Sequence, residues 1–261
     1  MLEEETVEKV AKESRISMRF PDPGKLPPPV LMLQNLSFNY PGGPTLYDRV
    51  DFGVDLDSRI ALVGPNGKGK TTLLKMLTGE LVPTTGAVRP HPHLRIARYT
   101  QHLSDTLDLV QTPLEHFSAL MPDLPPSEVR KKIGRYGVNG EMQTTKMAYL
   151  SNGIKSRVVF AKLALRTPHL LLLDEPTNGL DIETIDALAE GINSFGGGVV
   201  LVSHDMRLLQ QVVKQIYECD NGAVRLFPGD IMAYKAMLSK RLQAIDDAAA
   251  AAKAKAKAAA K

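Results

Sequence analysis

One short stretch of the chain has the residue types and spacing of a phosphate-binding loop. The stretch "GPNGKGKTT", residues 64–72, follows the apolar run "IALV" and opens the helical pattern "TTLLKMLTGE". It matches G-x-x-x-x-G-K-[ST] at Gly64, Gly69, Lys70 and Thr71. Glycines let backbone N–H groups converge on a phosphate, and the start of the helix adds partial positive charge. The stretch predicts an ATP site with Lys70 on the β- and γ-phosphates and Thr71 on Mg²⁺.

The whole loop is expected to contact the nucleotide, mostly through its backbone. Its members are Gly64, Pro65, Asn66, Gly67, Lys68, Gly69, Lys70, Thr71 and Thr72.

An acidic pair follows a second apolar run, in "LLLLDEPTNGLD", residues 170–181. Asp174 is the first charge after the leucines, where a carboxylate can hold the water shell of Mg²⁺. Glu175 comes next and could orient and deprotonate an attacking water; bound phosphates nearby favour a raised pKa. The alternative is a pair of acids that only caps a helix before Pro176.

A histidine ends a third apolar run, in "VVLVSHD", residues 199–205. The imidazole of His204 could hydrogen-bond the γ-phosphate or the carboxylate that orients water. A structural histidine is the alternative, but its position after a strand favours the functional interpretation.

These residues need a parallel sheet to bring them together. The short apolar runs alternate with helical patterns, and "DIETIDALAEGINSF" places Ile182, Ile185, Leu188 and Ile192 on one predicted face. Ligands of such sheets bind beyond the carboxyl ends of the strands. Upstream, "VLMLQNLSFNY" has the alternation and aromatic content of strands. The predicted class is α/β, with a mainly parallel core sheet, a small antiparallel β subdomain and a helical subdomain.

The linear order suggests three regions. Residues 1–20 look helical and charged, and the proline-rich "FPDPGKLPPPV" marks a linker, so residues 1–29 are predicted to precede the domain. The domain is expected over 30–235, with its helical subdomain at about 102–160. An Ala/Lys-rich helical tail is expected over 236–261.

Composition limits the classes of protein that remain. The net charge is +3, but the last nine residues hold four lysines and no acid, and the rest has 28 basic against 29 acidic residues. The tail is either a solvated helix or a loose contact to a polyanion such as RNA. A single cysteine, Cys219, allows no internal disulfide, and no apolar run approaches the ~20 residues of a membrane span. The acidic, polar start lacks the apolar region of a secretory signal.

Together the motifs resemble the ATP-binding cassette family, in the order of an aromatic residue, phosphate loop, Gln loop, signature, acidic strand and histidine. The resemblance covers roughly residues 30–235. It implies ATP hydrolysis with Mg²⁺, catalysed by Glu175, His204 and Gln101, and metal binding by Thr71, Gln101 and Asp174. It also implies that Tyr40 stacks on adenine, and that Ser151, Gly153 and Asp181 act across a dimer of cassettes.

The match narrows to the F subfamily, whose members have two cassettes in one chain, lack transmembrane domains and act on ribosomes. The stretches "FPDPGKLPPPV" and "PGDIMAYK" resemble the second cassette of the eukaryotic branch linked to ribosome assembly and export. The resemblance implies a second cassette as partner, because each ATP lies between the phosphate loop of one cassette and the signature of the other. It also implies a ribosome, pre-ribosomal particle or RNA as partner and no membrane, with a cytoplasmic location or a nuclear one.

The signature departs from the family pattern. The pattern is L-S-G-G-Q, and residues 150–154 read "LSNGI". Asn152 is the milder change, because asparagine tolerates left-handed backbone angles. Ile154 removes a side-chain amide, and Gly179, where the subfamily usually has histidine, is expected to loosen the loop before Asp181. These changes predict low activity for the isolated chain.

Two rival functions remain open from the sequence. One is an energy-coupling subunit of a membrane transporter, which would grip a membrane partner through residues 102–150. The other is a truncated module that binds ATP and hydrolyses little of it.

Overall fold

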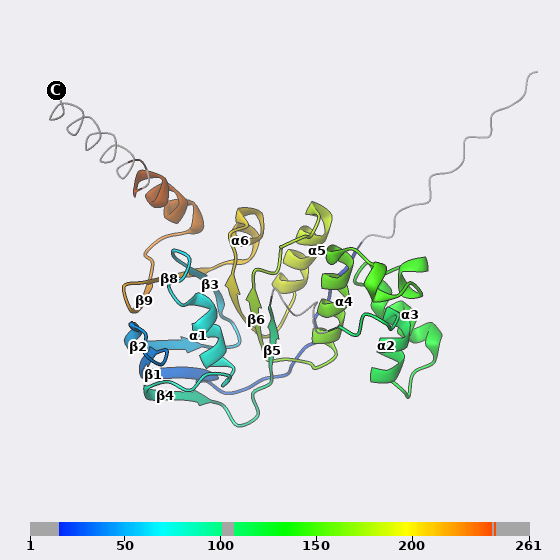
Figure 1. Cartoon of the computed structure of the whole chain (residues 1–261), viewed down its shortest axis with the longest axis horizontal. Coiled ribbons are helices and arrows are strands. Elements are labelled where there is room, and N and C mark those ends of the chain that lie inside the picture. Colours follow the sequence, from blue (N-terminus) through cyan, green and yellow to red (C-terminus); the bar gives the residue numbers. More distant parts are fainter. Residues whose placement is uncertain (1–15, 101–106, 242, 244–261) are drawn as a thin grey trace, which may run out of the picture.

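A six-stranded sheet forms the centre of the computed structural model, which describes residues 16–100, 107–241 and 243 (Figure 1). Its strand order is β5-β6-β7-β3-β8-β9; the first five strands run parallel and β9 is antiparallel to β8. Short runs of leucine, valine and isoleucine form the inner strands because both faces of the sheet are covered. The bounds are β3 (Arg59–Val63), β5 (Ile96–Tyr99), β6 (Leu170–Asp174), β7 (Gly198–Val202), β8 (Gln215–Asp220) and β9 (Ala223–Leu226).

A second sheet of three antiparallel strands has the order β2-β1-β4. Its strands are β1 (Leu31–Asn39), β2 (Thr45–Val54) and β4 (Thr85–Pro90). Leu31 and Leu33 are buried in β1, and Leu36 and Phe38 are buried after a register shift that follows Leu33. On each side of the shift alternate residues are buried, as expected for a strand with one face on the core. Their side chains pack with β3 and α1 (Lys70–Leu77) in one apolar cluster.

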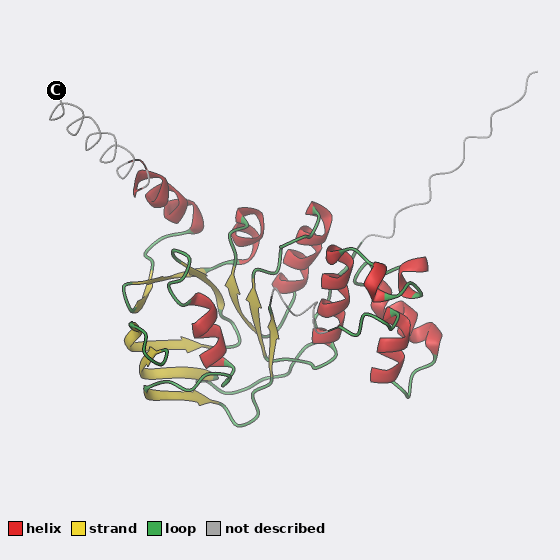
Figure 2. Ribbon diagram, in the orientation of Figure 1, coloured by secondary structure: helices red, strands yellow, loops and turns green. Residues whose placement is uncertain are grey.

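Helices cover the central sheet and form a lobe at one end (Figure 2). Helices α4 (Asn152–Ala164), α5 (Ile182–Asn193) and α6 (Met206–Val212) lie along the sheet, and a further helix spans 231–241. The helical lobe contains α2 (Pro113–Leu120), α3 (Pro126–Gly134) and the 3₁₀ turns η2 (Gly140–Gln143) and η3 (Met147–Tyr149). It lies beyond α4, on the side away from the antiparallel sheet (Figure 1). These three parts match the predicted fold class.

The predicted apolar face of α5 is correct at three of its four positions. Ile185, Leu188 and Ile192 are buried, whereas 63% of Ile182 is exposed. Ile182 is the first residue of α5, next to the exposed Asp181, so it lies outside the part of the helix that covers the core. The prediction is therefore wrong for Ile182.

The chain enters the fold as an extended segment. Residues 16–20 form no helix, and Ile16, Met18 and Phe20 are buried between exposed neighbours. The helical expectation is wrong for these five residues, because alternate side chains enter the core. Residues 1–15 and 244–261 lie outside the described part. The predicted division of the chain after residues 29 and 235 stays a prediction.

Candidate functional site

The phosphate loop connects β3 to α1 in a conformation that requires glycine. Gly64, Gly67 and Gly69 have positive φ angles of 139°, 78° and 95°. A Cβ on Gly64 would lie 2.3 Å from the carbonyl oxygen of Cys219, and one on Gly69 would lie 2.8 Å from the hydroxyl of Tyr47. Neither position has room for a side chain. The sequence pattern and the local backbone therefore agree.

Lys70 is the first residue of α1 and is held by the loop it follows. Its Nζ donates to the carbonyl oxygens of Gly64, at 2.8 Å, and Pro65, at 3.0 Å. Only 8% of the residue is exposed. Burial lowers the pKa of Lys70, and nearby groups that include Glu175 and Asp174 oppose that shift. The ammonium group is thus preorganised next to the acids.

A cavity of about 820 Å³ opens over α1 and the ends of β6 and β7. Its size falls within the usual range of ligand sites, about 300–1,000 Å³. The residues of this nucleotide-sized cavity that the sequence predicted are Tyr40, Asn66, Gly67, Gly69, Lys70, Thr71, Thr72, Asp174, Glu175 and His204. The fold therefore gathers residues that are up to 164 positions apart in the chain.

Asp174 and Glu175 are consecutive residues at the end of β6, but they differ in backbone conformation. Asp174 is the last residue of the strand and is buried. Glu175 has a positive φ of 50°, and its N–H donates to the carbonyl oxygen of Val202 in β7, at 2.8 Å. A left-handed conformation is uncommon for a residue other than glycine and is found at functional sites. Contact with β7 holds this turn in place.

The turn brings the Glu175 carboxylate next to His204. The Oε1 atom of Glu175 lies 3.5 Å from Nε2 of His204. Burial raises the pKa of Glu175, while the imidazole of His204 opposes the shift. A carboxylate with a raised pKa is better suited to accept a proton.

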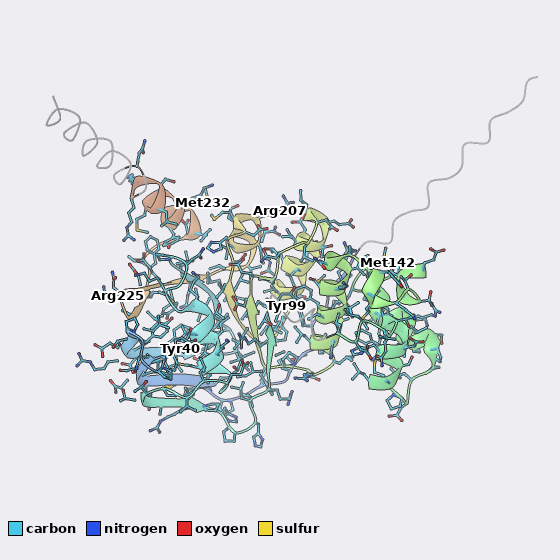
Figure 3. All side chains as sticks on the ribbon, viewed as in Figure 1. Tyr40, Tyr99, Met142, Arg207, Arg225 and Met232 are labelled. Carbon is cyan, nitrogen blue, oxygen red and sulfur yellow. The ribbon has the colours of Figure 1, made fainter. Side chains whose placement is uncertain are left out.

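Tyr40 stands at the mouth of the cavity. Its hydroxyl lies 3.0 Å from Oγ1 of Thr72, and its ring packs edge-to-face on Phe38 at 5.0 Å between centroids. Figure 3 shows Tyr40 beside α1, and 44% of the residue is exposed. This placement leaves the ring available to a planar ligand.

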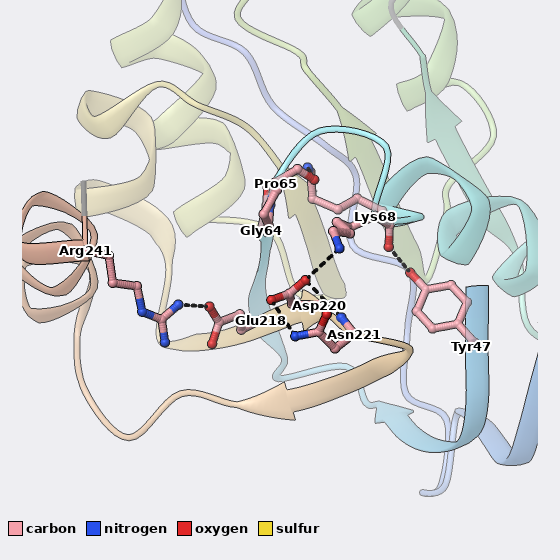
Figure 4. Close-up of polar contacts among 9 residues, drawn as sticks. Tyr47, Gly64, Pro65, Lys68, Glu218, Asp220, Asn221 and Arg241 are labelled. Atoms are coloured by element: carbon pink, nitrogen blue, oxygen red, sulfur yellow. Dashed lines mark hydrogen bonds and ion pairs between the residues drawn. The ribbon is translucent and has the colours of Figure 1, made fainter. Parts of the chain in front are cut away.

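Lys68 points away from the cavity, although it belongs to the phosphate loop. Its Nζ pairs with Oδ1 of Asp220 at 3.2 Å, and its carbonyl oxygen accepts a bond from Tyr47 (Figure 4). The same view shows Arg241, from the helix over 231–241, paired with Glu218 at 2.8 Å. The side chain of Lys68 is therefore directed away from the cavity, and only its backbone could contact a phosphate bound there.

The signature residues lie elsewhere on the chain. Ser151, Gly153 and Asp181 do not line the cavity that holds Lys70 and Glu175. Ser151 caps α4, where its Oγ accepts from the N–H of Ile154 at 3.4 Å, which leaves the hydroxyl hydrogen free to donate. Gln101 lies outside the described residues.

The loop at Gly179 forms a turn and packs on the signature. Gly179 has a φ of 76°, and its neighbour Leu180 donates from its N–H to the carbonyl oxygen of Thr177 at 3.0 Å. A Cβ on Gly153 would lie 2.7 Å from the carbonyl oxygen of Gly179. The expected loosening by Gly179 stays a prediction, and in this structure the signature packs directly on this loop.

The donor set of the cavity fits ATP and Mg²⁺. The glycine backbone and Lys70 supply N–H groups and positive charge for phosphates. The Thr71 hydroxyl and the Asp174 carboxylate both line the cavity and are oxygen donors of the type that Mg²⁺ prefers. These residues could hold the metal with the phosphates.

The sequence interpretation missed several residues of the cavity wall. Lys75, Glu80, Arg98 and Thr100 line it, and Nη1 of Arg98 donates to Oε2 of Glu80 at 2.6 Å. A signal for two of them was available, because Arg98 and Thr100 lie beside Gln101 in "RYTQH", at the end of β5.

Comparison with known proteins agrees with this geometry. The ABC transporter family matches residues 47–178, about half of the chain. The solved dimeric structure of a post-hydrolysis state of the ATP-binding cassette MJ0796, bound to ADP and Pi, aligns with a TM-score of 0.64 at 22% identity. The alignment covers 76% of this chain and 98% of that one, and shows the same fold. The chain belongs to the ATP-binding cassette family.

Its relatives place it in the F subfamily. ATP-binding cassette sub-family F member 2 of Bos taurus is 54% identical over 237 residues, which are 90% of this chain and 38% of that protein. ABC transporter ATP-binding protein ARB1 of Saccharomyces cerevisiae is 50% identical over 242 residues, 90% of this chain and 39% of that protein. The chain thus spans about two fifths of the length of these curated relatives. Within the described part, no helix combines the length and apolar character needed to cross a membrane.

Proposed function

We propose that this chain is the ATP-hydrolysing cassette of an F-type ATPase that acts on ribosomes, in their assembly or in translation. In this proposal it completes its catalytic sites only with a second cassette. The observation that carries it is the separation of two half-sites: one cavity gathers Lys70, Glu175 and His204, and Ser151 and Gly153 lie outside it. The isolated chain is then a slow ATPase.

Each residue has a role in this mechanism. The glycine backbone and Lys70 bind the phosphates, Tyr40 stacks on adenine, and Thr71, Asp174 and Gln101 hold Mg²⁺. When bound by these residues, Mg²⁺ would neutralise charge on the phosphates. Glu175 orients a water molecule and takes its proton, and His204 holds the carboxylate in place.

The signature serves the partner's nucleotide. The free hydroxyl hydrogen of Ser151 donates to the γ-phosphate, Gly153 permits close approach, and the start of α4 adds partial positive charge. Asp181 belongs to the loop that connects the two sites. ADP lacks the γ-phosphate, so hydrolysis loosens the pair.

The ribosomal part of the proposal rests on the resemblance of "LSNGIKSRVVFAKLAL" and "LVSHDMRLLQQV" to the F subfamily. A cytoplasmic location, extending to the nucleus, goes with it. Co-sedimentation with ribosomal subunits in the presence of ATP tests this part, and recovery with membranes instead would favour a transporter subunit.

The need for a second cassette can be tested by light scattering on Glu175→Gln. We expect a monomer without nucleotide and with ADP, and a partial dimer with ATP and Mg²⁺. The part of the bovine relative that this chain does not match should pair with it more tightly than a second copy does. A dimer that is equally stable with ATP and ADP would contradict pairing through the γ-phosphate.

Adding one methyl group at Gly153 should disturb the signature and the loop at Gly179 and leave the phosphate loop intact. In Gly153→Ala the new Cβ would overlap the carbonyl oxygen of Gly179, at 2.7 Å, and displace the loop. Turnover of the assembled pair should fall by about tenfold or more, a loss of ~1.4 kcal/mol of transition-state stabilisation. ATP binding, followed by calorimetry, should stay unchanged. Asn152→Ala adds no atom near Gly179 and is the matched control; an equal fall in both variants would refute the steric explanation.

A further inference from the structure

Arg157 lies in α4, after the signature, and connects three segments of the chain. Its Nη2 forms an ion pair with Oδ2 of Asp181, and its Nη1 donates to the carbonyl oxygen of Gly137 at 3.4 Å. Only 13% of the Arg157 side chain is exposed, against 58% for Asp181. The partners of Arg157 are the loop before α5 and the turn after α3.

Asp181 binds Arg157 through one carboxylate oxygen and caps a helix with the other. Its Oδ1 accepts from the N–H of Thr184 at 2.8 Å and so caps α5. Burial alone would raise the pKa of Asp181, but bonds from Thr184 and Arg157 hold it below its ordinary value. Asp181 is therefore a carboxylate that binds α4 and α5 together. With Gly153 packed on Gly179, the signature and this loop form one unit.

Gly137 is held from both sides. Its φ is 76°, and a Cβ there would lie 2.9 Å from Nη1 of Arg157 and 3.0 Å from Cγ1 of Ile16. Next to it, the N–H of Ser17 donates to the carbonyl oxygen of Arg135 at 3.0 Å. We call the extended residues 16–23 the strap. The strap thus contacts the helical lobe at the turn that Arg157 also binds.

The strap also lies on the core of the fold. A Cβ on Gly191 of α5 would lie 2.7 Å from the carbonyl oxygen of Met18, so the two backbones are in direct contact. Phe20 packs edge-to-face on Phe195, with 5.8 Å between centroids. The strap thereby joins α5 to the helical lobe, and Arg157 joins the same two parts through Asp181 and Gly137.

We propose that Arg157 is a positioning residue: it fixes the signature loop and the Asp181 loop to the strap and helical lobe, in the geometry that the partner's nucleotide requires. A displacement of the strap then reaches the signature through Gly137 and Arg157. The role toward the partner's nucleotide rests on the proposed function. The role of Arg157 in holding the two loops in position is independent of it.

The first test needs no partner and follows amide hydrogen exchange in the isolated chain. In Arg157→Met, residues 151–154 and 179–181 should exchange about tenfold faster, because local opening is no longer opposed by the ion pair. Arg157→Lys keeps a charge for Asp181 and should show a smaller increase. Arg166→Met removes an exposed arginine from the segment after the same helix and should change neither segment. Unchanged exchange in Arg157→Met would overturn the proposal.

The second test measures whether the position of the signature loop affects ATP hydrolysis at the partner's site. One chain carries Glu175→Gln and supplies only its signature; the other carries Ser151→Ala and supplies only its phosphate loop and Glu175. Adding Arg157→Met to the first chain should lower turnover of the mixture about tenfold, since each tenfold in rate is ~1.4 kcal/mol. Adding it to the second should not, and ATP affinity should stay constant in both.

The outcomes separate the two proposals. Equal loss with Arg157→Met on either chain would show general destabilisation and overturn the positioning role. A mixture with no turnover above its separate chains, even with Arg157 intact, would refute pairing between copies, while the exchange measurement would still decide the role of Arg157.

Discussion

Replacing Glu175 with glutamine should lower steady-state ATP turnover about 10²–10⁴-fold, the usual effect of losing a general base. The amide keeps the size of the carboxylate and can still bond His204, 3.5 Å away in the parent chain, but it cannot accept a proton. ATP affinity should therefore be retained. The pair of cassettes should also come apart more slowly after ATP binds, because hydrolysis no longer removes the γ-phosphate. Phosphate release at saturating ATP measures the turnover, and calorimetry measures the ATP affinity.

Glu183→Gln is the matched control, because Glu183 is an exposed carboxylate in the first turn of α5. It should leave turnover unchanged. If Glu175→Gln retained most of the activity under conditions where the parent chain turns over, another group would have to be the base.

Lys70→Ala should weaken ATP binding by at least about tenfold, or ~1.4 kcal/mol. Lys70 is buried, lies in the cavity wall and is held by the carbonyl oxygens of Gly64 and Pro65, so its charge is expected to be next to the phosphates of ATP bound in this cavity. Bonds from an ammonium group to phosphate oxygens are stronger than neutral ones. Calorimetry with ATP and Mg²⁺ measures the loss.

A second lysine of the same loop provides the comparison. Lys68→Ala removes an equal charge, but this side chain pairs with Asp220 rather than facing the cavity. Its affinity for ATP should fall by less than about threefold, ~0.7 kcal/mol. Equal losses in the two variants would show that net charge, and not the placement of Lys70, controls binding.

The phosphate loop and the acidic strand could be predicted from the sequence because their chemistry depends on adjacent residues. The glycines of 64–69 act through their own backbone, and Lys70 and Thr71 take their positions from the helix that they begin. Asp174 and His204 needed one further step, since parallel strands end at the same edge of a sheet. Alternation of apolar runs and helical patterns was enough to predict that sheet.

Other features depended on contacts between distant segments. The left-handed turn at Glu175 is held by Val202, and Lys68 turns to Asp220 on β8. Ile182 fits the apolar period of α5, yet it is exposed because the helix begins there beyond the core. A local sequence pattern indicates which side chains could be buried. It does not indicate which other parts of the chain would pack against them.

The sequence by itself determined the class of this protein and the order of its motifs, and it predicted most of the charged and loop residues that line the cavity around Lys70. All of these features are written in contiguous stretches. Only the tertiary structure decided that Arg157 joins Asp181 and Gly137, and that the strap packs on α5 and the helical lobe. The reason is physical: an ion pair or a close backbone contact depends on distance and direction in space. Residues 16, 137, 157 and 181 carry no shared period or spacing, and only the packed helices bring them together.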